Sequence, residues 1–244
     1  MTSALSLGYR HIDTAQAYGN EEEVGRGIAK SGVKREDIFL TTKVWRSSLD
    51  ARGVKSSTAE SLDRLGTDYV DLLLVHWPND SVPMGETLGA FAELKAEGKT
   101  RHIGVSNYTP RHLTEAIETH KADLFCNQVE YHPQLNQDAL LALLRKHGLA
   151  LVAYSPLGRG RIVKNPVLAK IGAKYGKSAS QVALNWLVRQ DHVATIPKAS
   201  SPAHCKANLE IFDFELTPDE VAEIAKLDAK SRVWQPSWGP RWDG

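Results

Sequence analysis

The sequence predicts an α/β protein of the (β/α)8-barrel class. Short strand-like segments rich in Val, Ile and Leu alternate with helical segments along the 244 residues, a rhythm typical of barrels built from βα units. No linker, low-complexity stretch or shift in composition interrupts this rhythm, so we expect one domain over residues 1–244. Neither a G-x-G-x-x-G after a strand nor a Walker-type loop is present, which counts against the main open-sheet alternatives.

The strands are predicted from composition and position. The segment "YVDLLLVHW" at 69–77 is a nearly unbroken apolar run, typical of a strand that is covered on both faces. The seven predicted strands span residues 9–13, 37–43, 69–77, 101–106, 124–130, 149–155 and 193–197.

The helices are predicted from apolar spacing and from their end signals. In the helix over 20–32, Asn20 is the expected N-cap, the glutamates that follow suit the positive end of the helix dipole, and Gly32 suits a left-handed end. The same reasoning predicts helices over 50–65, 86–97, 110–119, 137–147, 178–190, 201–209 and 217–227.

The charge balance excludes several classes of partner. The 30 basic and 29 acidic residues are well mixed and leave a formal net charge of +1, so we expect neither nucleic acid nor a membrane surface as a partner. No apolar run approaches the ~20 residues needed to span a bilayer, and the start of the chain lacks the features of a secretory signal. Cys126 and Cys205 form no disulfide framework and share no metal-ligand spacing. We therefore expect a cytoplasmic monomer that holds no metal.

Three consecutive predicted strands end on ionisable residues. Asp13, Lys43 and His76 lie at these ends, and Tyr18 follows the first of them by five residues. A lone lysine at a strand end is more often a solvated charge, and a lone histidine after an apolar run is usually a satisfied core residue. Barrels of this class carry their chemistry at the C-terminal ends of the strands, so four such residues on one rim predict an active site.

The chemistry of this set is that of a proton donor. Lys43 beside Tyr18 would favour the phenolate, and Asp13 would keep Lys43 charged and aimed. His76 could donate a hydrogen bond to a carbonyl oxygen, so that the set would protonate a developing alkoxide. The set holds no source of hydride and no nucleophile, so a cofactor must supply one.

Seven motifs carry a family resemblance. In order and spacing, the chain from about Ser3 to Asp243 resembles the aldo-keto reductase family. The tail "PSWGPRWD" is similar to bacterial members that reduce 2,5-diketogluconate or methylglyoxal. The motifs are "GYRHIDTAQAYGNE", "TTKVW", "VDLLLVHWP", "GVSNY", "NQVEYHP", "AYSPL" and "IPKASS".

The resemblance implies a catalytic tetrad of Asp13, Tyr18, Lys43 and His76, with Tyr18 as the general acid and direct hydride transfer from a nicotinamide cofactor. The implied cofactor-binding residues are Ser106, Asn107 and Gln128 at the carboxamide, Tyr154 on the ring, Ser155, Leu157 and the loop 158–161 at the pyrophosphate, and Lys198, Ser201, His204 and Asn208 at the adenine and 2′-phosphate end.

Two positions depart from the family pattern. The family commonly has an arginine where His204 stands and a glutamate where Ala207 stands. A mostly neutral histidine binds a phosphate less strongly than an arginine does, because the arginine side chain is permanently charged and donates two parallel hydrogen bonds. Lys198 still favours NADPH, while NADH stays possible.

The tryptophans have open roles. Trp45 and Trp77 match aromatic residues that wall the substrate pocket in the family, with packing on the outer barrel as the alternative. In the tail, Trp234, Trp238 and Trp242 form either a lid over the barrel mouth or an exposed oligomer patch.

The front of the chain also departs from the family. Members carry a β-hairpin, a first barrel strand and a full first helix before the segment that matches "ALSLGYRHID", and only the end of that helix is expected here, at residues 2–7. We expect an N-terminally incomplete barrel of about seven parallel strands, open between the strands 9–13 and 193–197. A shortened chain explains this most simply.

The leading hypothesis is an NADPH-dependent reductase of small aldehydes and ketones, such as oxo-sugar acids and 2-oxoaldehydes. The alternatives are a non-catalytic cofactor-binding or regulatory protein, or a truncated and inactive fragment. A Schiff-base lyase that uses Lys43 would need an uncharged lysine in an apolar site, and Asp13 opposes this.

Overall fold

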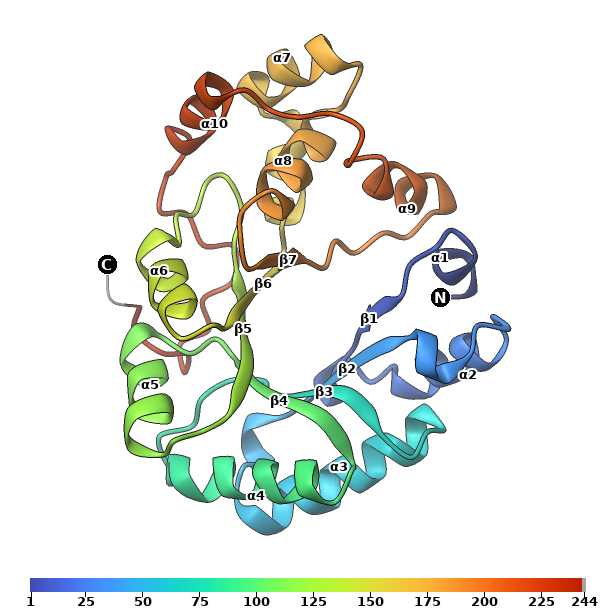
Figure 1. Ribbon diagram of the computed structural model, residues 1–244, viewed down its shortest axis with the longest axis vertical. Coiled ribbons are helices and arrows are strands. Elements are labelled where there is room, and N and C mark those ends of the chain that lie inside the picture. The colour runs from blue at the N-terminus through green and yellow to red at the C-terminus, as the bar shows by residue number, and fades with distance from the viewer. Residues whose placement is uncertain (243–244) are drawn as a thin grey trace. The chain divides into compact units, whose positions relative to one another are not determined.

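The computed structural model of the protein describes residues 1–242 (Figure 1). Asp243, where the resemblance ends, and Gly244 lie outside the described residues. The chain divides into two compact units. The first consists of Met1–Asn127 with residues 239–242, and the second of Gln128–Trp238. The single domain over 1–244 stays a prediction.

The strands follow one another in the sheet in chain order, from β1 to β7. As predicted, the described residues hold seven strands in this sheet, with β1 and β7 as its first and last members. No eighth strand from the tail joins them within residues 1–242.

Four strands of the first unit are parallel neighbours. Asp13 lies opposite Thr41, and Lys43 lies opposite Leu74. Because these strands run parallel, their C-terminal ends lie at one edge of the sheet. The bounds are β1 His11–Asp13, β2 Phe39–Val44, β3 Val70–Val75 and β4 Thr100–Ser106.

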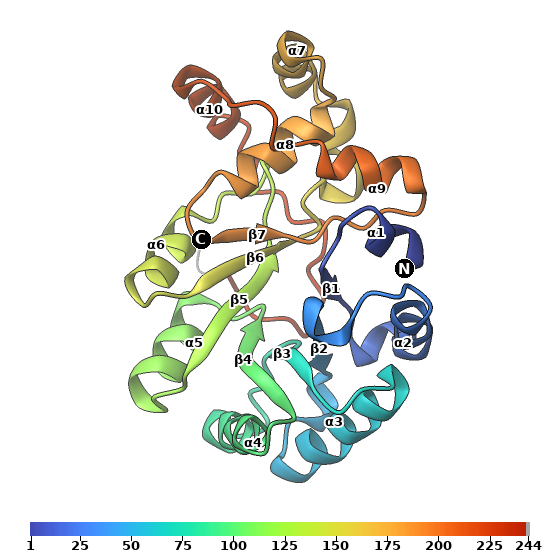
Figure 2. The same ribbon diagram turned by 45° about the vertical axis from the view of Figure 1, so that its right-hand side comes forward.

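The helices α2, α3 and α4 lie along one side of β1–β4 in both ribbon views (Figures 1 and 2). All six residues of β3 are buried, as expected of a strand whose two faces are both covered. The helices of this unit are α1 Thr2–Ser6, α2 Glu21–Ala29, α3 Ala51–Leu65, α4 Met84–Ala96 and α5 Pro110–Thr114, which continues into a π-helical turn at Glu115–Thr119; the 3-10 turns are η1 Gln16–Tyr18, η2 Arg35–Asp37 and η3 Arg46–Ser48.

The chain passes from the first unit to the second within β5 (Leu124–Glu130). In the second unit, β6 (Ala150–Tyr154) and β7 (Val193–Thr195) pair in parallel. A separate apolar core forms where α7 and α8 pack with the segment that leads into α10. The remaining elements are α6 Asp138–Lys146, η5 Gly158–Gly160, η6 Ile162–Lys164, α7 Pro166–Tyr175, α8 Ala179–Val188, α9 Pro202–Leu209 and α10 Pro218–Ala225.

One helix, α7, is missing from the sequence-based prediction, although its end signals are present. The Asn165 side chain accepts hydrogen bonds from the backbone N–H groups of Val167 and Leu168, Pro166 opens the helix, and Gly176 ends it at φ 66°. An N-cap asparagine, an N1 proline and a C-terminal glycine together mark a helix.

The prediction that the Asn20 side chain caps α2 is wrong. Asn20 does stand at the N-cap position of α2, but its side chain makes no capping hydrogen bond. Its Oδ1 instead accepts a hydrogen bond from the hydroxyl of Thr14 at 2.7 Å. A tertiary partner just past β1 thus replaces the local one.

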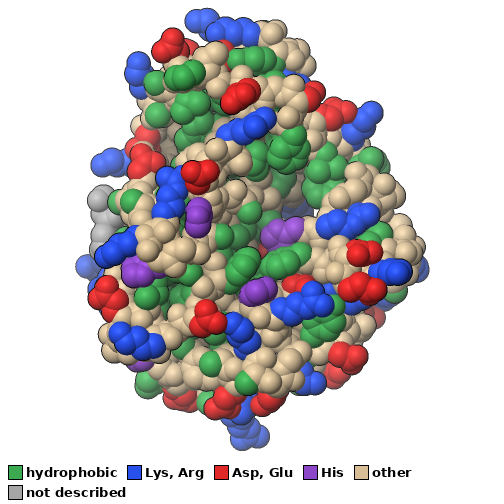
Figure 3. Space-filling model, viewed as in Figure 1, with side chains coloured by type: hydrophobic (Ala, Val, Ile, Leu, Met, Phe, Trp, Pro, Cys, Tyr) green, Lys and Arg blue, Asp and Glu red, His purple; other side chains and the backbone are tan. Residues whose placement is uncertain are grey.

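The surface carries charges of both signs, interspersed over the face that Figure 3 shows, in keeping with the balanced composition. None of the described helices is both long and apolar enough to cross a membrane.

Candidate active site

Four ionisable side chains come together after the first three strands. Asp13 is the last residue of β1, Lys43 is the last but one of β2, and His76 directly follows β3. Tyr18 is the last residue of η1, the turn that follows β1. The structure therefore assembles the four residues of the predicted tetrad within the first unit.

Lys43 carries a buried charge between two oxygen atoms. Its side chain is fully buried, and its Nζ donates to Asp13 Oδ1 at 2.5 Å and to the backbone oxygen of Thr14 at 2.9 Å. A buried ammonium is tolerated only when it is paired and hydrogen-bonded, so these partners hold Lys43 charged and fix its direction. The sequence does not reveal Thr14, because a backbone carbonyl contributes the contact.

Tyr18 presents its ring to both Lys43 and His76. The ammonium of Lys43 lies 5.0 Å from the ring centroid, within the range of a cation–π contact. The imidazole of His76 meets the same ring edge-to-face, with centroids 5.6 Å apart. Tyr18 is 52% exposed, so a substrate can reach it from solvent.

His76 is neutral and has free hydrogen-bonding capacity. Burial first, and the charge of Lys43 second, lower its pKa from 6.5 to about 3. The buried Nδ1 has no hydrogen-bond partner within residues 1–242. Buried polar atoms are nearly always paired, so this nitrogen is available to a molecule that would enter beside Tyr18.

The two predicted substrate tryptophans differ in their surroundings. Trp45 is partly exposed and packs edge-to-face on His76, with ring centroids 5.1 Å apart. Its backbone N–H donates to the side chain of Gln16 in η1 at 2.9 Å. Trp77 is only 4% exposed, which fits the packing alternative better. The position of Trp45 fits a pocket wall.

Ser106 ends β4, and Asn107 directly follows it. The Nδ2 of Asn107 donates to the backbone oxygen of His76 and to the hydroxyl of Ser106, each at 3.0 Å. Asn107 has a left-handed backbone at φ 61°, a conformation that asparagine tolerates better than most residues. These bonds tie the end of β4 to the residue that carries the imidazole.

In the second unit, the predicted pyrophosphate segment follows β6. Gln128 is buried in β5, and Tyr154 and Leu157 are partly exposed. Ser155 and Arg159 both have left-handed backbones, at φ 46° and φ 50°. Such strained positions cluster at ligand sites, where the surrounding structure holds them in place.

The predicted phosphate end lies at and before α9. The hydroxyl of Ser201 caps this helix by accepting from the backbone N–H of His204 at 3.2 Å. Lys198 and His204 are exposed, whereas Asn208 is buried. A lysine that is open to solvent is available to a phosphate.

The start of the Trp-rich tail is hydrogen-bonded to Glu130 in the second unit. The sequence does not reveal this contact. The fully buried carboxylate of Glu130 accepts from the backbone N–H groups of Val233 and Trp234, at 2.7 and 3.1 Å. The guanidinium of Arg159 lies 5.0 Å from the ring centroid of Trp234. The tail therefore packs on the loop 158–161, while Trp234 and Trp238 stay 43% and 39% exposed.

No cluster of three or more His, Cys, Asp or Glu side chains suited to a metal ion occurs within residues 1–242.

Chemically, the tetrad offers a reachable phenol, a buried cation against its ring and a neutral imidazole. This set can protonate and hydrogen-bond an oxygen on which negative charge develops.

The chain is similar to known proteins over nearly its whole length. Residues 1–229 match the family described as Aldo/keto reductase family. An aldo-keto reductase from Mycolicibacterium smegmatis is 43% identical over 234 residues, which cover 96% of this chain and 85% of the relative. The chain belongs to the aldo/keto reductase family.

Other aldo/keto reductases agree in sequence and in fold. Methylglyoxal reductase DkgB from Escherichia coli O157:H7 is 39% identical over 245 residues, which cover 99% of this chain and 91% of the relative. A crystal structure that bears the provisional name 2,5-diketo-D-gluconic acid reductase B matches with a TM-score of 0.97 and 46% identity, over 100% of this chain and 87% of the other. The aldo-keto reductase AKR2E5, solved with NADPH, matches with a TM-score of 0.92 and 35% identity, over 97% of this chain and 79% of the other.

These likenesses confirm three predictions. The protein is an NAD(P)H-dependent oxidoreductase of the aldo/keto reductase family, and the family supports carbonyl reduction as its chemistry. Its fold is of the (β/α)8 type, and residues 1–242 hold seven strands in the sheet. The roles of the individual site residues stay predictions.

Proposed function

We propose that this aldo/keto reductase reduces small aldehydes and ketones to alcohols with NADPH, and that Tyr18 is the general acid. One observation carries the proposal: the buried pair of Lys43 and Asp13 points its ammonium at the ring of Tyr18, beside a neutral His76 whose Nδ1 has no hydrogen-bond partner among residues 1–242. A structural cluster would have no need of an unpaired buried imidazole nitrogen next to a reachable phenol.

The residues of this chain divide the work at the carbonyl group. NADPH, when bound, supplies the hydride for the carbonyl carbon. Tyr18 donates its phenolic proton to the carbonyl oxygen, and the charge of Lys43 stabilises the phenolate that this leaves. His76, neutral because of its lowered pKa, donates a hydrogen bond that orients the same oxygen. Trp45 forms an apolar wall beside His76 and excludes water there.

The residues at the predicted cofactor positions fit a dinucleotide. In the first unit, Ser106 and Asn107 offer a hydroxyl and an amide to the nicotinamide carboxamide. In the second unit, we propose Tyr154 for the ring, Ser155 and the loop 158–161 for the pyrophosphate, and Lys198 for the 2′-phosphate. The left-handed backbones of Asn107, Ser155 and Arg159 and the exposed ammonium of Lys198 support this assignment. The similarity to AKR2E5, a protein solved with NADPH, supports NADPH over NADH.

The substrate class follows from the relatives. Methylglyoxal reductase and 2,5-diketo-D-gluconic acid reductase are the names of similar proteins, so we propose 2-oxoaldehydes and oxo-sugar acids as substrates. The decisive experiment follows NADPH absorbance with methylglyoxal and with 2,5-diketogluconate, for the parent protein and for Tyr18→Phe.

We expect Tyr18→Phe to lower kcat by roughly 10²–10⁴-fold, the usual contribution of a general acid, while NADPH binding, followed by fluorescence, stays nearly unchanged. Tyr69→Phe is the matched control, since Tyr69 packs on Arg35 and Arg101 away from the tetrad. A Tyr18→Phe variant that keeps more than about a tenth of the parent kcat would remove Tyr18 from this role.

The monomeric and cytoplasmic state stays a proposal. Sedimentation of the purified protein tests the first part: a mass near 26.9 kDa agrees with a monomer, whereas a dimer mass contradicts it.

A further inference from the structure

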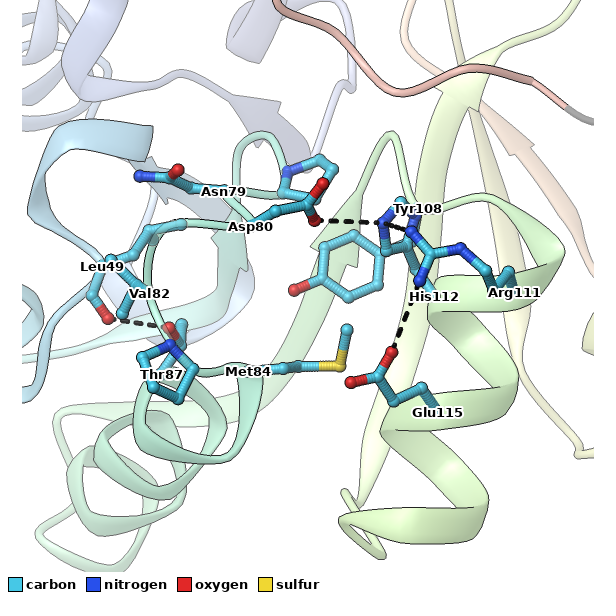
Figure 4. A pocket seen from close by; sticks show the side chains of 12 residues that line it. Leu49, Asn79, Asp80, Val82, Met84, Thr87, Tyr108, Arg111, His112 and Glu115 are labelled. Carbon is cyan, nitrogen blue, oxygen red and sulfur yellow. Dashed lines mark hydrogen bonds and ion pairs between the residues drawn. The ribbon is translucent and has the colours of Figure 1, made fainter.

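A cavity lies in the first unit, and no residue of the tetrad lines it. Its volume is about 310 Å³. Its walls are Leu49 in the connection between β2 and α3, the loop between β3 and α4 with the start of α4, and the turn between β4 and α5 with the π-helical turn (Figure 4). Seven of its lining side chains carry the argument: Leu49, Asp80, Met84, Tyr108, Arg111, His112 and Glu115.

Tyr108 has a buried side chain at the edge of this cavity. The residue is only 2% exposed, and its hydroxyl points into the cavity (Figure 4). Among residues 1–242 the hydroxyl makes no hydrogen bond, although the ring packs on His112 with centroids 5.5 Å apart. The side chain is buried but its hydroxyl is open to the cavity, so the hydroxyl can hydrogen-bond to a polar group that enters there.

The charges around the cavity are predominantly negative. Arg111 is occupied, since its guanidinium lies 3.0 Å from His112 Nε2 and 3.7 Å from a carboxylate oxygen of Glu115. Burial first, and Arg111 second, lower the pKa of His112, so the imidazole is neutral near pH 7. Two carboxylates and one cation thus line the cavity, and in the described part of the chain Asp80 pairs only with the neutral His112, at 3.6 Å.

The opposite wall is apolar. Met84 stretches its side chain across the cavity below the ring of Tyr108 (Figure 4), and Leu49 closes the same side. A ligand for this space therefore needs a small apolar body and a head group that donates hydrogen bonds to oxygen. The ring face of Tyr108 also favours a cation.

We propose that this cavity is a second small-molecule site, separate from the tetrad, which binds an organic ammonium ion. The ammonium donates to the carboxylates of Asp80 and Glu115 and to the hydroxyl of Tyr108. The apolar body of the ligand lies against Met84 and Leu49.

Met84 allows a direct test, because the chain has two methionines and the other is Met1. Protein labelled with ¹³C at the methionine methyl groups gives two signals, and Met84→Leu assigns them. We would titrate this protein with benzylamine, benzyl alcohol and benzoate, which share a ring and differ in charge, up to roughly 10 mM.

We expect benzylamine to shift the Met84 signal saturably while the Met1 signal stays in place, and to bind more tightly than the neutral and anionic analogues. Tyr108→Phe should weaken benzylamine by roughly 3- to 10-fold, the effect of losing one hydrogen bond. Asp80→Asn and Glu115→Gln should each weaken it as well. Glu118→Gln, on the same helical segment but outside the cavity lining, is the matched control and should leave the affinity unchanged.

Three results would overturn the proposal. The Met84 signal fails to shift with benzylamine; benzoate binds as tightly or more tightly, which makes the site one for anions at Arg111; or benzyl alcohol matches benzylamine, which makes the cavity merely apolar. An unchanged Met84 signal in ligand-free Tyr108→Phe shows that the cavity is intact, so that a loss of affinity reports the missing hydroxyl.

Discussion

The ammonium of Lys43 lies 2.5 Å from the carboxylate oxygen Oδ1 of Asp13, with side-chain exposures of 0% and 8%. Removing one member of such a buried pair leaves an uncompensated charge, whereas removing both does not. The pair therefore couples the stability of the fold to the chemistry of the site.

We expect Asp13→Asn and Lys43→Met each to lower the free energy of unfolding by about 3–5 kcal/mol, and the double variant to lower it by less than the sum of the two. Urea denaturation of the four proteins measures this coupling. All three variants should lose carbonyl reduction, because none holds a directed cation against Tyr18. Strictly additive losses of stability would show that the two charges do not interact.

The lowered pKa of His76 predicts a pH dependence of stability. In the unfolded chain this histidine binds a proton below about pH 6.5, whereas in the folded protein it does so only near pH 3. The contribution of His76 to stability is therefore complete above pH 6.5 and is lost progressively as the pH falls towards 3.

In His76→Gln, the slope of unfolding free energy against pH should fall by about one proton within this window. His11 and His112 also have pKa values lowered by burial, so part of the slope should remain. The chemical shift of the His76 ring proton gives a direct check. A titration of that proton near pH 6.5 would contradict the neutral imidazole assigned to His76.

The carboxylate of Glu130 predicts how the tail is held. Glu130→Gln keeps one acceptor oxygen but turns an amide N–H₂ toward one of the backbone donors of Val233 and Trp234. We expect amide hydrogen exchange at these two residues to speed up and stability to fall by about 1–3 kcal/mol, the cost of a buried unsatisfied group. Glu210→Gln is the control, because Glu210 is half exposed and pairs loosely with Lys206 at 3.7 Å. Unchanged protection at Val233 and Trp234 would show that other contacts hold the tail.

We expect the side chain at position 204 to affect the preference for NADPH over NADH. His204→Arg places a permanently charged fork on the exposed first turn of α9, where we propose that the 2′-phosphate binds. NADPH binding should tighten by roughly 5- to 30-fold, equivalent to about 1–2 kcal/mol for one charge-assisted contact, and NADH binding should change little. Fluorescence titration with both coenzymes measures this, and His120→Arg controls for the added charge. An equal gain for both coenzymes would place position 204 away from the phosphate.

The sequence by itself determined the order of the strands and the residues at their ends. Alternating apolar runs and turn signals are local patterns, so the strands ending at Asp13 and Lys43 and the one leading into His76 could be found without a structure. In parallel neighbours, the C-terminal ends share one edge, which is why three residues far apart in the chain could be predicted to meet. The signals of helix α7, Asn165 before it and Gly176 after it, are also local, so this helix could have been predicted in the same way.

Only the tertiary structure decided which atoms those residues contact. Asn20 bonds to Thr14 instead of capping its own helix, and Glu130 holds the backbone of Val233, which lies 103 residues away. The hydroxyl of Tyr108 opens into a cavity whose walls come from three separate connections. A residue's type limits what it can bind, but its hydrogen-bond partners depend on which backbone and side-chain atoms the folded chain brings within about 3 Å, and no local pattern encodes that distance.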